Sequence, residues 1–440
     1  MNWTTASLSA VLSLSLANIA GAQGVPVAAS QENPPQQVNA ELRRIAALEA
    51  KLAELQREIE ELRGSSLQRH DAFQVLPVPV QHDELPFEHA VSGEPPSDTD
   101  AEGPAGDLPR ALPIDAYGSL RGATAVDAAG HSEIRNNASR LGLRGERRLG
   151  DFTAFARIEV GVNLVSNDRV ILVSGDPGTP IGQGSQAIAS RLGLVGIRTS
   201  VGAFSWGKQW SPYYDVAEFT DQFQVFSAAA SGAFAAGTDG GISGTGRAER
   251  ALQYREEKGP VSVAVQVQNR TSSSSDRGWA DTYGASVVFG KVRGITAGAA
   301  YNEVRDGVQD PTPNDPRLGD KAALFGLRYR SDRWYAAGTF SILRQHEIDD
   351  LGRAFDGHGF ELAVRRLVTD RWWLEGGYND LRPDSDHPGD YRERFGVANA
   401  VYEFGDASRL FFGFKVEGSR RSDRSRLAES AVAGGLNFTF

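Results

Sequence analysis

The feature that most constrains this chain is a pair of alternating segments within residues 139–164. In the second segment the apolar residues share one parity, and polar or charged residues occupy most of the other. The apolar set is Ala154, Ala156, Ile158, Val160, Val162 and Leu164, and the opposite set includes Thr153, Arg157, Glu159, Gly161 and Asn163. Alternation with a period of two places these sets on opposite faces of a β-strand. Leu149-Gly150-Asp151 separates the two segments and is typical of a tight turn, so the pattern predicts an antiparallel hairpin.

Each strand of this hairpin has about ten residues, enough to cross a lipid bilayer when the strand is tilted. One face carries small and branched apolar side chains, and the other carries full charges. A soluble sandwich would have to bury Arg157 and Glu159 in its core at a high desolvation cost. The pattern therefore favours a wall with lipid on one side and water on the other.

Composition narrows the class of protein further. None of the 440 residues is cysteine, which excludes disulfides, thiol nucleophiles and thiolate metal sites. The body of the chain contains no apolar run long enough for a transmembrane helix. The formal net charge of −10 is concentrated in residues 71–109, which hold nine acidic residues and no lysine or arginine. The remainder is close to neutral, which does not favour nucleic-acid binding.

Two segments before the alternating region have compositions unlike that of the barrel region. Residues 1–22 combine an apolar core with Ala20-Gly21-Ala22, a pattern typical of a secretory signal peptide, although no basic residue precedes the core. The alternative for this segment is a short buried helix. Residues 64–110 hold seven prolines and the acidic run, so they are predicted to form an extended linker.

Residues 38–63 show a heptad pattern, with mostly apolar residues at positions a and d and charged residues at most e and g positions. This pattern predicts a parallel coiled coil, and the order Arg-Ile-Ala-Ala-Leu-Glu at 44–49 resembles a motif of trimeric coiled coils. The residues expected at the trimer contact are Arg44, Ile45, Leu48, Glu49, Leu52, Leu55, Ile59 and Leu62. The alternative is a single amphipathic helix that lies on its own domain.

From residue 112 to residue 440 the alternation of the first hairpin recurs, most clearly in Val261–Gln268 and Leu410–Gly418. Seven short turns separate strand pairs: Leu149-Gly150-Asp151, Arg198-Thr199-Ser200, Glu257-Lys258-Gly259, Gly290-Lys291, Ser331-Asp332-Arg333, Thr369-Asp370-Arg371 and Phe404-Gly405-Asp406. Seven turns imply eight hairpins, and the other connections are long and polar. The chain is therefore predicted to be all-β, with a 16-stranded antiparallel transmembrane barrel that encloses an aqueous lumen.

Aromatic residues gather beside the short turns, as expected for the interfacial girdle of a membrane barrel. They are Phe152, Phe204, Trp206, Trp334, Tyr335, Trp372, Trp373 and Phe404. A propeller or a sandwich is the soluble alternative, but its strands run shorter and some of them are apolar on both faces.

Several segments resemble the Gram-negative general porins, which are trimeric diffusion channels of the outer membrane. The segments are 138–164, ASRLGLVG at 189–196, AFSWGKQWSPYYD at 203–215 and the C-terminal strand 431–440. In the last segment, Phe438 and Phe440 resemble the insertion signal of outer-membrane proteins. The coiled-coil extension is similar to that of DcaP-like porins, a resemblance that implies dicarboxylate uptake as an alternative function.

The resemblance also implies that the third loop of the barrel folds inward and narrows the lumen. The matching stretch is 211–246, and its acidic residues are expected to oppose arginines of the barrel wall. Opposed charges across a narrow aqueous waist favour polar over apolar solutes. The candidate constriction residues are Arg121, Arg140, Arg144, Arg157 and Arg191 on the wall, and Asp215, Glu218, Asp221 and Asp239 on the loop. Arginine outnumbers lysine in this chain, which adds the hypothesis of a mild anion preference.

No catalytic constellation emerges from the sequence. The histidines of the barrel region show no spacing that suggests pairing with a serine, and neither a phosphate loop nor an HExxH motif occurs. The stretch 384–389 begins like a calcium loop, but Phe395 stands where that loop needs glutamate. No catalytic residue, metal site or cofactor is therefore expected.

The sequence thus predicts a homotrimeric outer-membrane porin for passive diffusion of small hydrophilic solutes, with its N-terminal extension in the periplasm. The expected partners are outer-membrane lipid, lipopolysaccharide, the solutes and, through the extension, peptidoglycan. The alternatives are a selective channel for small anions such as dicarboxylates, an outer-membrane enzyme and a peptidoglycan tether.

Overall fold

A computed structural model describes residues 114–166, 170–171, 182–183, 187–227, 229–269, 280–292, 294–305, 320–404 and 408–440. The expected signal peptide (1–22), coiled coil (38–63) and linker (64–110) lie outside these residues. In the part of the chain that is described, no helix has the length and apolar character needed to cross a membrane.

Antiparallel strands make up nearly all of the described structure. In chain order the elements are β1 (Ile114–Asp127), β2 (Ser132–Asn136), β3 (Arg140–Leu149), β4 (Phe152–Val162), β5 (Val170–Ile171), β6 (Gly182–Gln183), β7 (Ile188–Thr199), β8 (Gly202–Trp210), α3 (Tyr214–Ala217), η2 (Ala235–Gly237), β9 (Arg247–Lys258), β10 (Val261–Gln268), β11 (Thr282–Val292), β12 (Ile295–Val304), β13 (Lys321–Arg330), β14 (Trp334–Ile348), β15 (Ala354–Thr369), β16 (Trp372–Pro383), β17 (Glu393–Phe404), β18 (Ser408–Glu417) and β19 (Ala431–Thr439). All except β5, β6 and the two short helices belong to one sheet.

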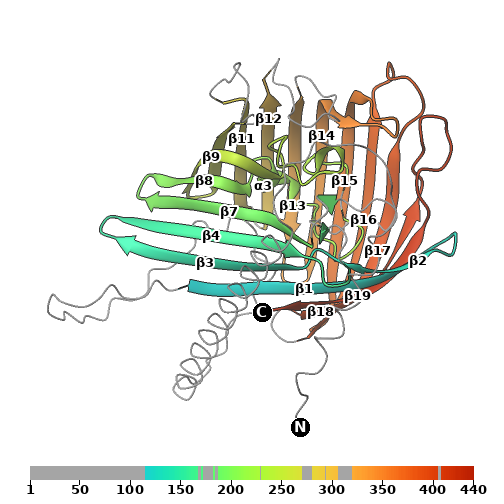
Figure 1. The fold of residues 1–440 in the computed structure, drawn as a ribbon, viewed down its shortest axis with the longest axis horizontal. Coiled ribbons are helices and arrows are strands. Elements are labelled where there is room, and N and C mark those ends of the chain that lie inside the picture. The colour runs from blue at the N-terminus through green and yellow to red at the C-terminus, as the bar shows by residue number, and fades with distance from the viewer. Residues whose placement is uncertain are drawn as a thin grey trace, which may run out of the picture. The chain divides into compact units, whose positions relative to one another are not determined.

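This sheet closes on itself as a barrel (Figure 1). The first strand pairs with the last, from Ser119 opposite Thr439 to Asp127 opposite Ala431. On its other side β1 pairs with both β2 and β3, which form one strand interrupted at Ala138, where φ is +62°. The barrel therefore has sixteen strands, and the prediction is confirmed. Closure gives every strand two neighbours, which satisfies the backbone groups without water.

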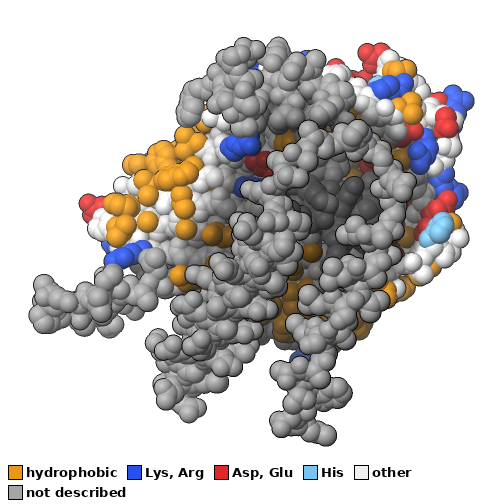
Figure 2. Space-filling view, viewed as in Figure 1, with side chains coloured by type: hydrophobic (Ala, Val, Ile, Leu, Met, Phe, Trp, Pro, Cys, Tyr) orange, Lys and Arg blue, Asp and Glu red, His pale blue; other side chains and the backbone are white. Residues whose placement is uncertain are grey.

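The two faces of the wall separate apolar from polar side chains as the alternation predicts. The side chain of Val265 is 50% exposed, whereas its neighbour Gln266 is 3% exposed. Ile158 and Glu159 differ in the same way. Hydrophobic side chains cover the outer surface of β7, β8 and β9, at the left of Figure 2. The outer face is therefore suited to lipid, and the charged residues line the lumen.

Six of the seven predicted short turns fall where one strand ends and the next begins. The prediction at Gly290-Lys291 is wrong in position, because β11 continues to Val292 and β12 begins at Ile295. Gly294 has the positive φ (+80°) that a tight turn requires. Gly290 instead donates its backbone N–H to the carbonyl oxygen of Pro260 at 2.8 Å, as part of the sheet.

The predicted aromatic girdle is wrong at two positions. Tyr335 and Trp373 are both 7% exposed and face the lumen, whereas Trp334 and Trp372, which precede them, are largely exposed on the outer face. Successive side chains of a strand point to opposite faces, so only one member of each aromatic pair can reach lipid. Phe152, Phe204 and Trp206 are exposed on the outer face as predicted, and Phe404 is partly exposed.

Candidate functional site

The connection between β8 and β9, residues 211–246, enters the lumen, and we call it the inner loop (Figure 1). Its helix α3 packs against β11, β12 and β13. Two glycines make this approach possible: a Cβ atom built on Gly298 or on Gly326 would lie 2.9 or 2.7 Å from the side chain of Val216. The inward course and the bounds that the sequence predicts for this loop agree with the structure.

The middle of the inner loop reaches the strands on both sides of the barrel closure. Phe223 fills the space above Gly377 of β16, and Val225 lies against Gly413 of β18. Gln224 accepts hydrogen bonds at its carbonyl oxygen from Asn137 (2.7 Å) and at its side-chain oxygen from Asn437 (2.6 Å). This middle part is thus fixed to the wall by glycine hollows and by amide hydrogen bonds.

The returning part of the inner loop is held by acidic side chains of β14 and β15. The buried carboxylate of Glu361 accepts hydrogen bonds from the backbone N–H groups of Ala230 (2.6 Å) and Ser231 (2.7 Å). Thr220 donates its hydroxyl to the other oxygen of the same carboxylate. Farther along, Glu347 accepts the N–H of Ala236 at 2.7 Å. One wall carboxylate therefore joins the outgoing and returning parts of the loop.

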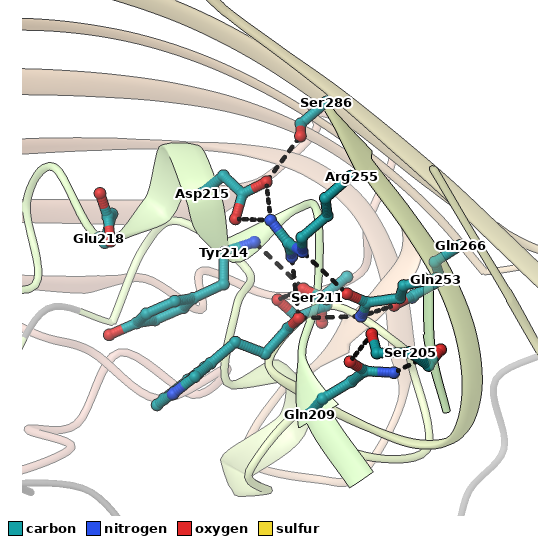
Figure 3. A network of polar contacts seen from close by, with 12 residues as sticks. Ser205, Gln209, Ser211, Tyr214, Asp215, Glu218, Gln253, Arg255, Gln266 and Ser286 are labelled. Carbon is teal, nitrogen blue, oxygen red and sulfur yellow. Dashed lines mark hydrogen bonds and ion pairs between the residues drawn. The ribbon is translucent and has the colours of Figure 1, made fainter. Parts of the chain in front are cut away.

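At the base of the inner loop, Asp215 of α3 is buried against Arg255 of β9 (Figure 3). One guanidinium nitrogen of Arg255 lies 2.8 and 2.9 Å from the two carboxylate oxygens, and Ser286 donates its hydroxyl at 2.7 Å. Burial raises the pKa of Asp215 above its ordinary value, and Arg255 and Ser286 oppose this shift. Asp215 thus fastens the loop to the wall.

Two further acids of the inner loop have their own cations on the adjacent wall. Glu218 lies 3.5 Å from Arg328 of β13, and Asp239 lies 2.9 Å from Lys208 of β8. Burial by itself would raise the pKa of Asp239, but Arg247 and Lys208 outweigh it and hold that pKa below its ordinary value. The structure does not pair these acids with the five arginines that the sequence singled out.

A second group of charges lies on the opposite side of the lumen, and we call it the arginine cluster. It consists of Tyr117 and Arg121 on β1, Arg140 on β3, Arg157 and Glu159 on β4, Arg191 on β7 and Arg247 on β9. Glu159 is at its centre: Arg191 donates to one carboxylate oxygen at 2.7 Å, and Arg157 donates to the other at 3.1 Å. Arg140 and Arg247 also interact with the charge of Glu159.

Two predicted loop acids interact with the arginine cluster: Asp239 interacts with Arg247, and Asp221 interacts with three of the arginines. Asp221 accepts a hydrogen bond of 2.6 Å from the hydroxyl of Tyr214, and its charge interacts with those of Arg247, Arg121 and Arg140. The ring of Tyr214 stacks on Trp210, with 3.9 Å between ring centroids. The cluster and Asp221 therefore form the place where charges of the wall and the loop oppose each other.

Arg144 lies at the edge of this group: it is opposite Arg157 on β4, and its guanidinium carbon is 5.9 Å from the centre of the Tyr117 ring. Its side chain is 37% exposed and its Nε is 3.6 Å from a carboxylate oxygen of Asp115, close to the short turn at Gly150. Arg121 is buried and donates its Nε to the hydroxyl of Ser119 at 2.7 Å. The structure thus groups Arg121, Arg140, Arg157 and Arg191 with Asp221, and Asp239 joins this group through Arg247.

Sequence reasoning missed Arg247 and Glu159 within the cluster, and Arg255, Arg328 and Lys208 among the partners of the loop. Most of these residues occupy the lumen-facing parity of their strands, a signal present in the alternation itself. Within the residues that the structure describes, no group of three or more histidine, aspartate or glutamate side chains could hold a metal ion.

The sequence of this chain is similar to those of known outer-membrane proteins. A family model described as Gram-negative porin matches residues 115–417. The outer membrane protein Omp-EA of Erwinia amylovora is 24% identical over 278 residues, which cover 58% of this chain and 67% of the relative. Outer membrane protein F of Serratia marcescens is also 24% identical, over 52% of this chain and 60% of the relative.

Solved structures of similar fold include three outer-membrane proteins, each covering 74% of this chain. A Salmonella typhi OmpF complex with daunomycin has a TM-score of 0.60 and 17% identity over 97% of that chain. The trimer form of OmpT from Vibrio cholerae has a TM-score of 0.53 and 13% identity over 99% of that chain. The outer membrane channel DcaP of Acinetobacter baumannii has a TM-score of 0.54 and 13% identity over 97% of that chain.

Proposed function

This chain belongs to the Gram-negative porin family, and on that premise we propose that it forms a water-filled channel for passive diffusion of small hydrophilic solutes. It is an outer-membrane protein, and the porins that it resembles are channels rather than enzymes. The observation that carries the proposal is the inner loop, which is fixed inside the lumen and faces the arginine cluster through Asp221. A loop held in this way narrows the aqueous path and leaves opposed charges at its narrowest part.

The constriction is formed by the arginine cluster and Asp221. Of the residues selected from the sequence, Arg121, Arg140, Arg157 and Arg191 supply its positive side. Asp215, Glu218 and Asp239 act as anchors of the loop, because each is paired with a cation of the wall beside it. Arg144 borders the constriction, opposite Arg157, and is paired with Asp115.

The charge balance at this place supports a moderate preference for anions. The cluster holds five arginines, and the carboxylates that interact with them are Glu159, Asp221 and Asp239, the last of which is also paired with Lys208. An excess of fixed positive charge beside a narrow aqueous path raises the local concentration of anions. A channel selective for small dicarboxylates is the second candidate function, since arginines on neighbouring strands can contact two carboxylates at once.

The functional unit is a homotrimer whose N-terminal extension lies in the periplasm. The heptad residues between Arg44 and Leu62 would join the three chains, and peptidoglycan is the partner that such an extension could reach. The start of β1 lies on the same side of the barrel as the short turns, since Ile114 is opposite Gly145 near the turn at Gly150. Phe438 and Phe440 would serve as the insertion signal, and lipopolysaccharide is the lipid expected around the barrel.

Reversal potentials in a planar bilayer test the proposal. Purified protein should give ohmic channels that prefer chloride to potassium under a salt gradient, and Arg157→Ala should reduce that preference. A dicarboxylate-selective channel would instead show a current that saturates with the concentration of a dicarboxylate salt. Absence of conductance would contradict the proposed channel function, and preference for potassium in the wild-type channel would contradict the anion preference alone.

A further inference from the structure

Glu159 is the one acidic member of the arginine cluster, and its carboxylate is almost fully buried. We propose that Glu159 determines how strongly the channel prefers anions, by neutralising Arg157 and Arg191 at the constriction. This inference rests on the proposed function and names the residue that limits its ion selectivity.

The hydrogen bonds of Glu159 come from three strands. Its Oε1 accepts from Nε of Arg191 on β7 at 2.7 Å. Its Oε2 accepts from Nη2 of Arg157 at 3.1 Å and from the hydroxyl of Tyr117 on β1 at 2.9 Å. A buried carboxylate is tolerated only when it is paired and hydrogen-bonded, and this one meets both conditions. Its negative charge therefore offsets mainly the positive charges of Arg157 and Arg191.

Strand register places the members of this group in one row. Tyr117 is opposite Gly142 of β3, and Gly142 is opposite Glu159 of β4. A Cβ atom at Gly142 would lie 2.2 Å from Cζ of Tyr117, so the tyrosine ring can cross β3 only because residue 142 is glycine. The tyrosine hydroxyl then accepts a hydrogen bond from Nε of Arg157 at 2.6 Å. Tyr117 thus fixes Arg157 beside Glu159 and adds no charge.

The rest of the cluster explains why the charge of Glu159 affects transport. Arg140 and Arg247 interact with Glu159 and also with Asp221 across the constriction. Removing the charge of Glu159 would leave the five arginines with Asp221 and Asp239 as their carboxylate partners, and Asp239 is shared with Lys208. A unit charge about 6 Å from a permeating ion in water changes the energy of that ion enough to alter its local concentration by about threefold.

The experiment compares Glu159→Gln with Glu375→Gln in the full-length protein. Glu375 on β16 is a matched control, because it is equally buried, accepts from Nε of Arg365 at 2.9 Å and accepts from Asn399 at 3.2 Å. Glutamine keeps the size and one acceptor oxygen at both positions. We expect Glu159→Gln to raise the chloride-to-potassium permeability ratio about threefold, and Glu375→Gln to change it much less.

Two further variants distinguish an effect of the charge of Glu159 from an effect of the position of Arg157. Tyr117→Phe keeps every charge but removes the hydrogen bond that holds Arg157, so its permeability ratio should change less than that of Glu159→Gln. The double variant Glu159→Gln, Arg157→Gln restores the wild-type net charge and should return the ratio towards the wild-type value. Heat-dependent migration on a gel checks that each barrel is folded.

The proposal is overturned if Glu159→Gln leaves the ratio unchanged, or if Glu375→Gln or Tyr117→Phe shifts it as much. Failure of the proposed function is distinguishable from this result. A wild-type channel that prefers potassium would contradict the anion preference, yet Glu159→Gln would still have to move the ratio towards chloride.

Discussion

The two sides of the lumen use their polar side chains in different ways. On the side of β12 to β18, glycines open hollows in the wall, and carboxylates and amides bind the inner loop directly. On the side of β1 to β7, charged side chains bind one another and stand across from Asp221. One side therefore determines where the loop lies, and the other determines which ions pass it.

The comparison shows that a buried carboxylate has a different role on each side of the lumen. Glu361 and Glu159 are both buried carboxylates of the barrel wall. Glu361 accepts backbone N–H groups of the loop, whereas Glu159 accepts arginines of its own wall. Substitutions on the first side should change the size of the path, and substitutions on the second should change its selectivity.

The largest effect is expected from Gly359→Ala on the side that holds the loop. A Cβ atom there would lie 1.8 Å from the carbonyl oxygen of Ala230 and 2.6 Å from the hydroxyl of Ser341. Such overpacking costs about 1–3 kcal/mol and should displace the returning part of the loop. We expect single-channel conductance to rise by about twofold as the constriction widens. Gly376→Ala is the control, because its Cβ would meet nothing closer than 3.9 Å; equal conductance changes in both variants would contradict the assignment.

A loss of stability, rather than a larger conductance, is expected from Glu361→Ala. This change leaves the N–H groups of Ala230 and Ser231 without their acceptor, at a cost of about 1–3 kcal/mol for each buried group left unpaired. The midpoint of thermal unfolding should fall, and the open-channel current should become noisier. Glu361→Gln keeps one acceptor oxygen, so its unfolding midpoint and its current noise should lie between those of the wild type and those of Glu361→Ala. A quiet channel of wild-type stability in Glu361→Ala would show that the carboxylate does not hold the loop.

Substitutions of two arginines on β3, Arg140 and Arg144, should change the ion selectivity by different amounts. Arg140 interacts with Glu159 and Asp221 at the constriction, whereas Arg144 lies beside Asp115 near the short turn. Arg140→Gln should lower the chloride-to-potassium permeability ratio about threefold, and Arg144→Gln should lower it less, because Asp115 already offsets part of the charge of Arg144. Both reversal potentials are measured under the same salt gradient. Equal shifts would mean that the whole lumen, rather than one place in it, sets the selectivity.

The smallest effect concerns pH at the base of the inner loop. The pKa of Asp215 is raised by burial, so the folded protein binds this proton more readily than the unfolded chain does. Protonation at Asp215 therefore stabilises the fold as the pH falls through the raised pKa. The pKa of Asp239 is lowered by Arg247 and Lys208, so its contribution is present above the ordinary carboxyl pKa and is lost only at more acidic pH.

On mild acidification, Asp215 should therefore gain its proton before Asp239 does. Arg255 then loses its counter-charge, and the permeability ratio should move slightly towards chloride. The measurement is the reversal potential as a function of pH in the wild type and in Asp215→Asn. A shift of the same size in the asparagine variant would assign the titration to another group.

The barrel could be predicted from the sequence because the alternation within each strand identifies which residues face lipid and which face the lumen. Val265 and Gln266, or Ile158 and Glu159, show the alternation without knowledge of any partner strand. The errors arose where local chemistry was ambiguous. Gly290 and Gly294 are equally plausible turn residues until the register of β11 and β12 is known.

The candidate site was less predictable, because it depends on register across several strands. The row of Tyr117, Gly142 and Glu159 joins three strands, and nothing in any one of them identifies the glycine as an opening for the tyrosine. The partners of the loop acids, such as Arg255 and Arg328, follow from the path of the loop. That path depends on glycines far along the chain, and alternation does not distinguish a glycine that receives a side chain from one that does not.

Pairing between β1 and β19 has a consequence for how the protein is made. Gly118 and Phe440 exchange backbone hydrogen bonds of 2.9 and 3.0 Å, which join the beginning of the cylinder to its end. During assembly of the barrel, one edge of β1 therefore stays unpaired until β19 reaches it, and β19 begins more than three hundred residues later in the chain. An exposed strand edge readily pairs with other chains. Biogenesis must therefore shield that edge until the final strand arrives, and a chain that lacks the final strand would be left with two adhesive edges.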